Sequence, residues 1–185
     1  MIKLHRLSLL TAAFLFATAV ANASGWTEPV EVRQEENLCL TYQAKLDGSL
    51  LIVRAMIEPG WHTFAMDIKK RAEEKLAGKA SLGIERGTEF QLSGGLETVG
   101  PWYQSSPKDF SKPEIRYFSW GYEHQALFAA KVKRAGPAPI RISIRGQACT
   151  ETSCKNIDSA ISLALDGVKA EGESEINLKN LIQVR

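Results

Sequence analysis

The segment from residue 140 to residue 165 reads IRISIRGQACTETSCKNIDSAISLAL. In its first part, isoleucine alternates with arginine or serine, which predicts a β-strand with one buried and one solvated face. In its last part, apolar residues recur and predict a partner strand. Two cysteines, Cys149 and Cys154, lie between these patterns, with four residues separating them. The segment therefore predicts an antiparallel hairpin with a cysteine pair at its tight end.

More strands are expected upstream of this hairpin. Residues 38–46 carry an apolar side chain at every second position, which predicts a half-buried strand. Asp47-Gly48 is a hairpin turn signal, and residues 50–57 form a β-rich return strand. Further extended pieces are predicted at 30–33, 61–66, 80–99, 115–122 and 125–133. Many short strands separated by Gly and Pro favour an all-β, antiparallel β-sandwich.

One segment has the pattern of a helix instead. Residues 67–77 are mostly charged, with Ala72 and Leu76 four positions apart, which predicts a short surface helix. Asp67 is suited to cap its start, and Gly78 is suited to end it. Residues 101–113, rich in Pro, Ser and aromatic residues, predict a loop.

The beginning of the chain has the pattern of a secretory signal peptide. Lys3, His5 and Arg6 form a basic n-region, residues 7–20 are largely apolar, and Ala21-Asn22-Ala23 is an A-x-A cleavage site. No later apolar run approaches the roughly 18 residues that a membrane-spanning helix needs. We therefore expect a periplasmic protein whose mature chain has no membrane span.

The expected domain organisation is a signal peptide over 1–23, one domain over 24–168 and a polar C-terminal tail over 169–185. Removal of the signal leaves 21 Lys and Arg against 21 Asp and Glu. A net charge near zero argues against a nucleic-acid partner.

The cysteine pair has two interpretations. Four intervening residues suit a hairpin in which the two side chains face each other and form a disulfide. A bridge that closes a loop of about six residues stabilises a fold by only roughly 2 kcal/mol. Such a short loop also leaves the sulfurs near the surface, where exchange requires them. The spacing alone leaves a structural staple and a working redox couple as equal alternatives.

The remaining candidate residues favour ordinary roles. Cys39 falls on the polar side of its strand pattern, and a structural role is expected for it. His62 and His124 do not have the spacing of zinc ligands, so neither a metal nor another cofactor is expected. We interpret His62 as a packed or surface residue, or as a titrating neighbour of the cysteines.

Three motifs resemble one known family. Residues 146–154, GQACTETSC, resemble the redox segment of the N-terminal periplasmic domain of the thiol:disulfide interchange protein DsbD. Residues 58–64, EPGWHTF, are similar to the "PGWH" strand of that family. Residues 109–115, DFSKPEI, are similar to its cap loop, although Ser111 stands where the family often has an aromatic residue. The resemblance spans roughly residues 30 to 166.

The resemblance implies an immunoglobulin-like β-sandwich that exchanges thiols and disulfides. It implies that Cys149 and Cys154 are the redox couple, that Phe110 caps them, and that Phe64 and Trp61 wall the site. The implied partners are thioredoxin-like periplasmic proteins and a separate membrane electron donor. The alternative from the residues alone is a non-catalytic β-sandwich binding or assembly module with a structural hairpin disulfide.

Overall fold

The computed structural model describes residues 25–83, 85–163 and 176–185. The signal peptide predicted over residues 1–23 lies outside these ranges. Within them, no helix is both long enough and apolar enough to cross a bilayer.

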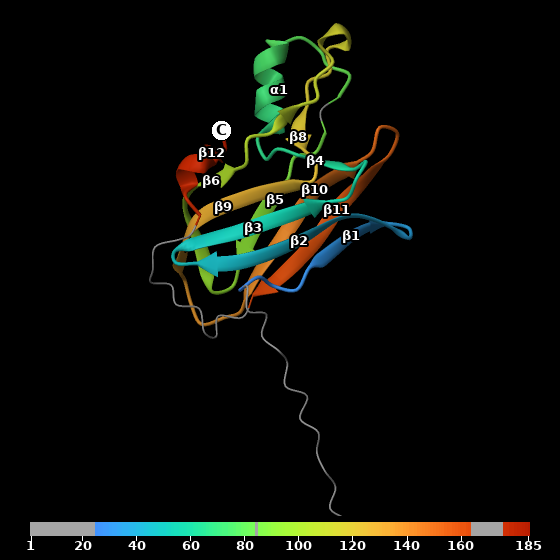
Figure 1. Ribbon diagram of the computed structural model, residues 1–185. Helices are drawn as coiled ribbons and strands as arrows, with labels where there is room; N and C mark the ends of the chain where they lie inside the picture. Colours follow the sequence, from blue (N-terminus) through green and yellow to red (C-terminus); the bar gives the residue numbers. More distant parts are fainter. Residues whose placement is uncertain (1–24, 84, 164–175) are drawn as a thin grey trace, which may run out of the picture.

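The described residues form two sheets in which every paired strand is antiparallel (Figure 1). The first sheet has the strand order β1(Val30–Gln34), β2(Asn37–Asp47), β3(Leu50–Ile57), β9(Gln125–Arg134), β6(Leu96–Gln104), β12(Ile182–Gln183). The second has the order β11(Cys154–Leu163), β10(Ile140–Cys149), β4(His62–Phe64), β8(Trp120–Tyr122), β7(Lys108–Asp109), and β5(Glu89–Ser93) also pairs with β10. The prediction of an all-β, immunoglobulin-like sandwich is confirmed.

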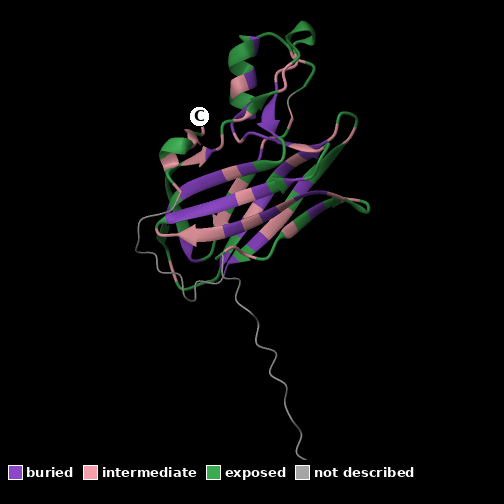
Figure 2. Ribbon diagram, in the orientation of Figure 1, coloured by how far each residue is buried: buried purple, intermediate pink, exposed green. Residues whose placement is uncertain are grey.

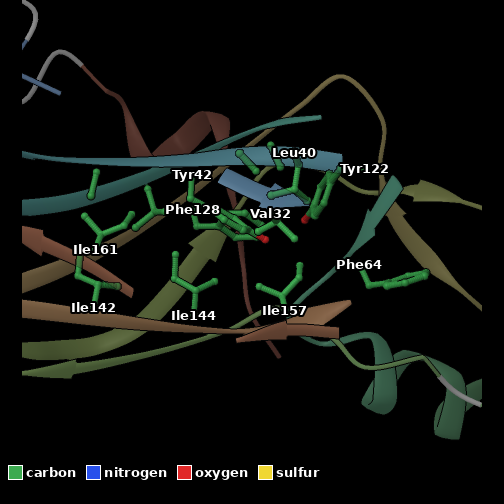
Figure 3. Packing of buried hydrophobic residues seen from close by; sticks show 14 of the residues in the cluster. Val32, Leu40, Tyr42, Phe64, Tyr122, Phe128, Ile142, Ile144, Ile157 and Ile161 are labelled. Atoms are coloured by element: carbon green, nitrogen blue, oxygen red, sulfur yellow. The ribbon is translucent and has the colours of Figure 1, made fainter. Parts of the chain in front are cut away.

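The core lies between the two sheets, where the alternating apolar residues of both meet (Figure 3). From the first sheet, Tyr42 and Phe128 are fully buried, as are Ile142 and Ile144 from the second. Buried stretches lie along the inner strands of the sandwich, and exposed residues lie mainly at strand ends and loops (Figure 2). Burial of the apolar alternation therefore holds the two sheets together.

A smaller lobe rises from one end of the sandwich (Figure 1). It contains α1(Ile68–Leu76), β7, β8 and the 3-10 helix η1(Pro113–Ile115). The helix buries Ile68, Ala72 and Leu76, in agreement with the predicted spacing. The bend between β10 and β11 reaches toward this same end of the sandwich (Figure 1). The lobe and the cysteine hairpin therefore share one end of the molecule.

The helix ends as predicted at Gly78, whereas the prediction that Asp67 caps its start was wrong in detail. Asp67 occupies the N-cap position, but its side chain makes no capping hydrogen bond. Its carboxylate instead accepts hydrogen bonds from Arg71 and Gln104. At the other end, Ala77 and Gly78 both have positive φ, 49° and 82°, so the chain leaves the helix where Gly78 was expected to end it. A side chain of the helix itself, Arg71, and the distant Gln104 thus bind the carboxylate that the local pattern assigned to capping.

Several strand boundaries also differ from the sequence prediction. β6 extends to Gln104, so the predicted loop at 101–113 begins inside a strand and also contains β7. Among the described residues of the 80–99 region, no strand precedes Glu89, and in the 115–122 region only Trp120–Tyr122 is a strand. Near the chain's end, β12 pairs with β6 inside the stretch that we expected to be a polar tail. The pairing of β6, β7, β8 and β12 depends on the strands beside them in the sheets rather than on local pattern.

Candidate functional site

Cys149 and Cys154 form the only disulfide that the described residues contain. Cys149 is the last residue of β10, Cys154 is the first of β11, and the two lie directly opposite each other in the antiparallel register. The hairpin predicted from the cysteine spacing is therefore confirmed.

The turn between the cysteines is held by Thr150. Its backbone N–H donates to the carbonyl oxygen of Ser153 at 2.8 Å. Its hydroxyl oxygen accepts from the backbone N–H groups of Thr152 and Ser153 at 3.3 and 3.1 Å. Outside the turn, the Gln34 side chain donates to the Ser153 hydroxyl at 2.9 Å. The hairpin is thus tied both within itself and to β1.

The two sulfur-bearing residues differ in exposure. Cys149 is 2% exposed, whereas Cys154 is an exposed residue. The difference arises because β10 has neighbours on both sides, β11 and β4, whereas β11 is the edge strand of its sheet. An incoming thiolate therefore has access to the residue on the edge strand.

On the opposite side of β10, Cys149 pairs with His62 of β4. Directly opposed residues of an antiparallel pair point to the same face of the sheet, with Cβ atoms about 4.5–5.5 Å apart. His62, Cys149 and Cys154 therefore form one row across three strands. Sequence reasoning left a neighbour of the cysteines as one of several roles for His62, because β4 and β10 are too far apart in the chain for any pattern to give this register.

Two phenylalanines lie against the His62 ring. The Phe64 ring meets it edge-on, with centroids 5.3 Å apart, and the Phe110 ring lies tilted against it, also at 5.3 Å. Phe64 is buried and Phe110 is half-buried. Phe64 and Phe110, two of the residues named by the resemblance, thus lie against the histidine that is opposite Cys149. Their roles as wall and cap stay predictions.

Other residues also hold the Phe110 ring in place. The Lys108 ammonium lies 5.2 Å from the centroid of its ring, within cation–π range. Lys108 in turn forms an ion pair with Glu123 at 2.7 Å. The missing side chain of Gly121 leaves space for the ring, because a Cβ there would lie 3.1 Å from Phe110 Cε2. No sequence pattern indicates the Lys108–Glu123 pair, since Lys108 lies on β7 and Glu123 lies in the turn between β8 and β9.

A groove of about 520 Å³ adjoins the hairpin. Its wall includes Trp61, the third residue named by the resemblance, which is half-buried and packs against the core. It is lined by Glu58, Pro59, Gly60, Trp61, His62, Glu123, His124, Thr150, Glu151 and Thr152. The groove gives a partner chain a concave approach beside the disulfide.

Burial shifts the acid–base behaviour of this region. It lowers the pKa of His62 from its usual 6.5, while the nearby carboxylates of Glu123 and Glu85 oppose the shift. Burial, together with a hydrogen bond donated to Glu85, raises the pKa of Tyr117 to about 12. His62 is therefore neutral around neutral pH.

Cys39 is a free cysteine and is 0% exposed, although its strand pattern placed it on the polar side. It is sheltered because β11 of the opposite sheet packs across β1 and β2. Burial raises the pKa of its thiol, against the opposing influence of Gln34, Lys155 and Arg33. Cys39 is therefore a protonated, inaccessible thiol. Across the described ranges, no group of three or more His, Cys, Asp or Glu side chains is arranged to hold a metal ion.

Comparisons with known proteins give the following matches. The crystal structure of the Neisseria meningitidis DsbD N-terminal domain in the reduced form aligns with 70% of this chain and 87% of its own, at 16% identity and a TM-score of 0.45. The complex between the DsbD N-terminal and PilB N-terminal domains from Neisseria meningitidis aligns with 78% of this chain and 94% of its own, at 12% identity and a TM-score of 0.40. No curated protein matches. The family model described as "Thiol:disulfide interchange protein DsbD, N-terminal" matches residues 30–165, and the chain therefore belongs to this family.

Proposed function

We propose that this protein is a periplasmic thiol–disulfide exchange protein whose Cys149–Cys154 couple passes electrons between a membrane reductase and thioredoxin-like partners. The observation that carries the proposal is the unequal exposure of a bonded cysteine pair in one tight hairpin. One cysteine is accessible for attack, and its partner is buried close enough to resolve the product. Family membership and the predicted signal peptide support both the reaction and the compartment.

When the protein donates electrons to a partner, it starts in its reduced form, with Cys149 and Cys154 as two thiols. The Cys154 thiolate attacks one sulfur of a partner disulfide, forms a mixed disulfide and expels the other partner sulfur as a thiolate. The Cys149 thiolate then attacks Cys154 Sγ, restores the Cys149–Cys154 bond and releases the second partner sulfur. Two electrons have passed to the partner, which is reduced to a dithiol, while the protein is oxidised.

The return to the dithiol requires a reductant. We assign this role to a membrane reductase, whose dithiol attacks the accessible Cys154 sulfur and runs the same exchange in the opposite direction. The groove beside the hairpin, about 520 Å³ in volume, offers both partners a place to approach.

The main competing explanation is a structural staple in a non-catalytic binding module. The reduction potential of the couple separates the two, because structural disulfides in secreted proteins typically have potentials below about −300 mV. Equilibration of the purified protein in glutathione buffers is expected to give a value above that limit. A lower value would support the staple.

Single-cysteine variants test the mechanism itself. Cys149→Ser leaves the attacking sulfur without its resolving partner, so it should accumulate a mixed disulfide with an oxidised thioredoxin-like protein. Cys154→Ser leaves only the buried sulfur and should trap far less. Equal trapping by the two variants, or trapping only by Cys154→Ser, would contradict the assigned order of attack.

A further inference from the structure

Two exposed apolar side chains lie at the end of the lobe that points away from the sandwich. Leu82 is 72% exposed, and Ile115 of η1 is 47% exposed. They come from different segments, but the Ser81 hydroxyl is hydrogen-bonded to the carbonyl oxygen of Arg116, the residue after η1, at 3.0 Å. This bond holds the 81–83 turn against the end of η1. The last turn of α1 and the yellow helix η1 form this end of the lobe in Figure 1.

The turn that carries Ile115 is closed by backbone hydrogen bonds. Lys112 and Tyr117 exchange two of them, at 2.8 and 3.2 Å, and the N–H of Arg116 donates to the carbonyl oxygen of Pro113 at 2.9 Å. A turn fixed in this way holds the exposed side chain outward. Ile115 is therefore presented to the solvent by a structured turn.

The same end of the lobe carries more basic than acidic side chains. We call residues 75–83 and 112–116 the tip surface; they include four Lys and Arg against one Glu, and all five side chains are exposed. Its charged members are Lys75, Lys79, Lys112, Arg116 and Glu114. Glu73 and Glu74, which precede it on α1, each form an ion pair with a basic residue outside it. The tip surface therefore combines exposed apolar side chains with positive charge.

We propose that the tip surface binds a bilayer that contains anionic phospholipids. Leu82 and Ile115 enter the interfacial region of the bilayer, and the basic side chains contact the lipid phosphates. The inference goes beyond the proposed function, because it assigns a lipid-binding surface that lies outside the exchange site.

The size and charge of the tip surface favour a bilayer over a protein partner. A specific protein interface buries about 800 Å² on each partner, whereas a bilayer accepts a small projecting tip. Each Lys or Arg near an anionic bilayer strengthens binding roughly fivefold. Burial of a Leu or Ile side chain strengthens it roughly tenfold or more. The two contributions add at the tip surface, because the same end of the lobe supplies both.

The location of the tip surface gives such binding a consequence. The lobe and the cysteine hairpin share one end of the molecule (Figure 1). A protein that rests on a bilayer through its lobe therefore has this end directed toward the membrane. The exchange couple is then brought close to the proposed membrane reductase.

Vesicle co-sedimentation tests the proposal directly. The probes are vesicles of phosphatidylglycerol with phosphatidylcholine, and vesicles of phosphatidylcholine alone, mixed with the protein without its predicted signal peptide. The protein should sediment with the anionic vesicles and not with the neutral ones. Raising the salt from about 0.15 M to about 1 M should weaken binding, because the Debye length falls from about 8 Å to about 3 Å. Absence of binding to the anionic vesicles, or equal binding to both kinds, would overturn the proposal.

Single variants with matched controls locate the binding surface. Leu82→Ser should weaken binding to anionic vesicles roughly tenfold, and Lys112→Gln roughly fivefold. Val99 on β6 and Lys131 on β9 are exposed residues of the same two kinds in the sandwich, so Val99→Ser and Lys131→Gln should bind as the wild type does. All four positions are exposed, and circular dichroism checks that each variant is folded. Equal weakening by the tip variants and the controls would reject the tip surface as the site.

Amide hydrogen exchange gives an independent map of the contact. Anionic vesicles should slow exchange in residues 79–83 and 112–116 and leave the β2–β3 turn at 47–49 unchanged. Protection confined to another face would overturn the proposal. So would a dimer of the lipid-free protein that is lost in Leu82→Ser, because the tip surface would then bind a second copy of the chain.

The outcome is separable from that of the exchange assays. The tip surface contains no cysteine, so the Cys149→Ser/Cys154→Ser double variant should bind anionic vesicles as the wild type does. An inert couple with normal vesicle binding would reject the proposed function alone. Normal exchange without vesicle binding would reject this inference alone.

Discussion

At the scale of single residues, the half-buried side chain of Phe110 is the predicted cap of the candidate site. Phe110 contacts His62 and Lys108, and it lies over the position where Gly121 has no side chain. An exposed cation–π contact contributes only about 0.5–1 kcal/mol. The ring is thus held by weak contacts, which is consistent with the cap role predicted for it.

Removal of the Phe110 ring tests its role as a cap. On the cap hypothesis, Phe110→Ala should react faster with small thiols than the wild type, because the ring that lies against His62, the residue opposite Cys149, is then removed. Stopped-flow measurement of dithiothreitol reduction gives the rate. Exposed Ile115 lies on the neighbouring 3-10 helix, so Ile115→Ala is a suitable control and should leave the rate unchanged. An unchanged rate in Phe110→Ala would reject the cap.

A second residue holds the lobe to the sandwich. The Asp67 carboxylate is 3% exposed and accepts hydrogen bonds from Arg71 Nε and Gln104 Nε2, both at 2.7 Å. The backbone N–H of Arg185 also donates to it at 3.4 Å. Burial alone would raise its pKa, but these donors outweigh burial and lower the pKa from 3.8. This one carboxylate therefore connects α1, β6 and the last residues of the chain.

Asp67→Asn should destabilise the protein by about 2 kcal/mol near neutral pH, because a charged acceptor is removed from a buried network. Since the folded-state pKa is the lower one, the contribution of Asp67 is present above about pH 4 and is lost as the pH falls through the folded-state pKa. Urea unfolding at several pH values measures both effects. The exposed Asp158→Asn is the control. A stability difference that grows on acidification would contradict this account.

At the scale of elements, the site is made where short strands of the second sheet meet. β4 pairs with β10 on one side and β8 on the other, and β8 also pairs with β7. This order carries Cys149, His62 and Phe110 to one end of one sheet. The long hairpins supply stability, whereas strands of two or three residues position the candidate site.

Gly121 lies where β8 packs so closely against β4 that there is no room for a side chain. A Cβ at Gly121 would run into the carbonyl oxygen of Thr63 on β4 and would also approach the Phe110 ring. Gly121→Ala should therefore destabilise the protein by roughly 1–3 kcal/mol through overpacking, and it should increase the reactivity of the disulfide. Gly136→Ala, where a Cβ meets no atom within 4 Å, is the matched control for thermal unfolding and for phosphine reduction. If both variants unfold at the same temperature, the β4–β8 contact is less restrictive than proposed.

At the scale of the whole molecule, stability comes from the apolar layer between the two sheets rather than from the disulfide. The bond joins residues only 5 positions apart, and such a short loop contributes roughly 2 kcal/mol. Fully buried side chains such as Tyr42, Phe128 and Ile142 lie in the core, which does not depend on the bond. The sandwich should therefore stay folded whether the cysteine pair is oxidised or reduced.

Reduction should lower the melting temperature without unfolding the protein. A loss of about 2 kcal/mol corresponds to roughly 4–8 °C for a domain of this size. Calorimetry of the oxidised protein, the reduced protein and the Cys149→Ser/Cys154→Ser double variant measures the shift. The reduced protein and the double variant should melt at similar temperatures. Unfolding upon reduction at room temperature would show that the bond is a structural staple.

Several structural features of this protein were predicted from local sequence pattern. The alternation over 140–144 and 38–46 predicted the buried faces of β10 and β2, and the cysteine spacing predicted a hairpin in which the two cysteines face each other. These features are local, because a strand places every second side chain on one face and a tight turn sets the register of its own hairpin. The sequence alone therefore determined the fold class and the hairpin.

The tertiary structure decided which residues lie together around the cysteine hairpin. The pairing of β4 with β10 placed His62 opposite Cys149, and the edge position of β11 left Cys154 exposed while Cys149 became buried. The pairing of β12 with β6, and the burial of Cys39 under the opposite sheet, likewise had no local signal. The physical reason is that non-local strand pairing and burial are set by how all apolar faces are covered at once, which no short stretch of sequence encodes by itself.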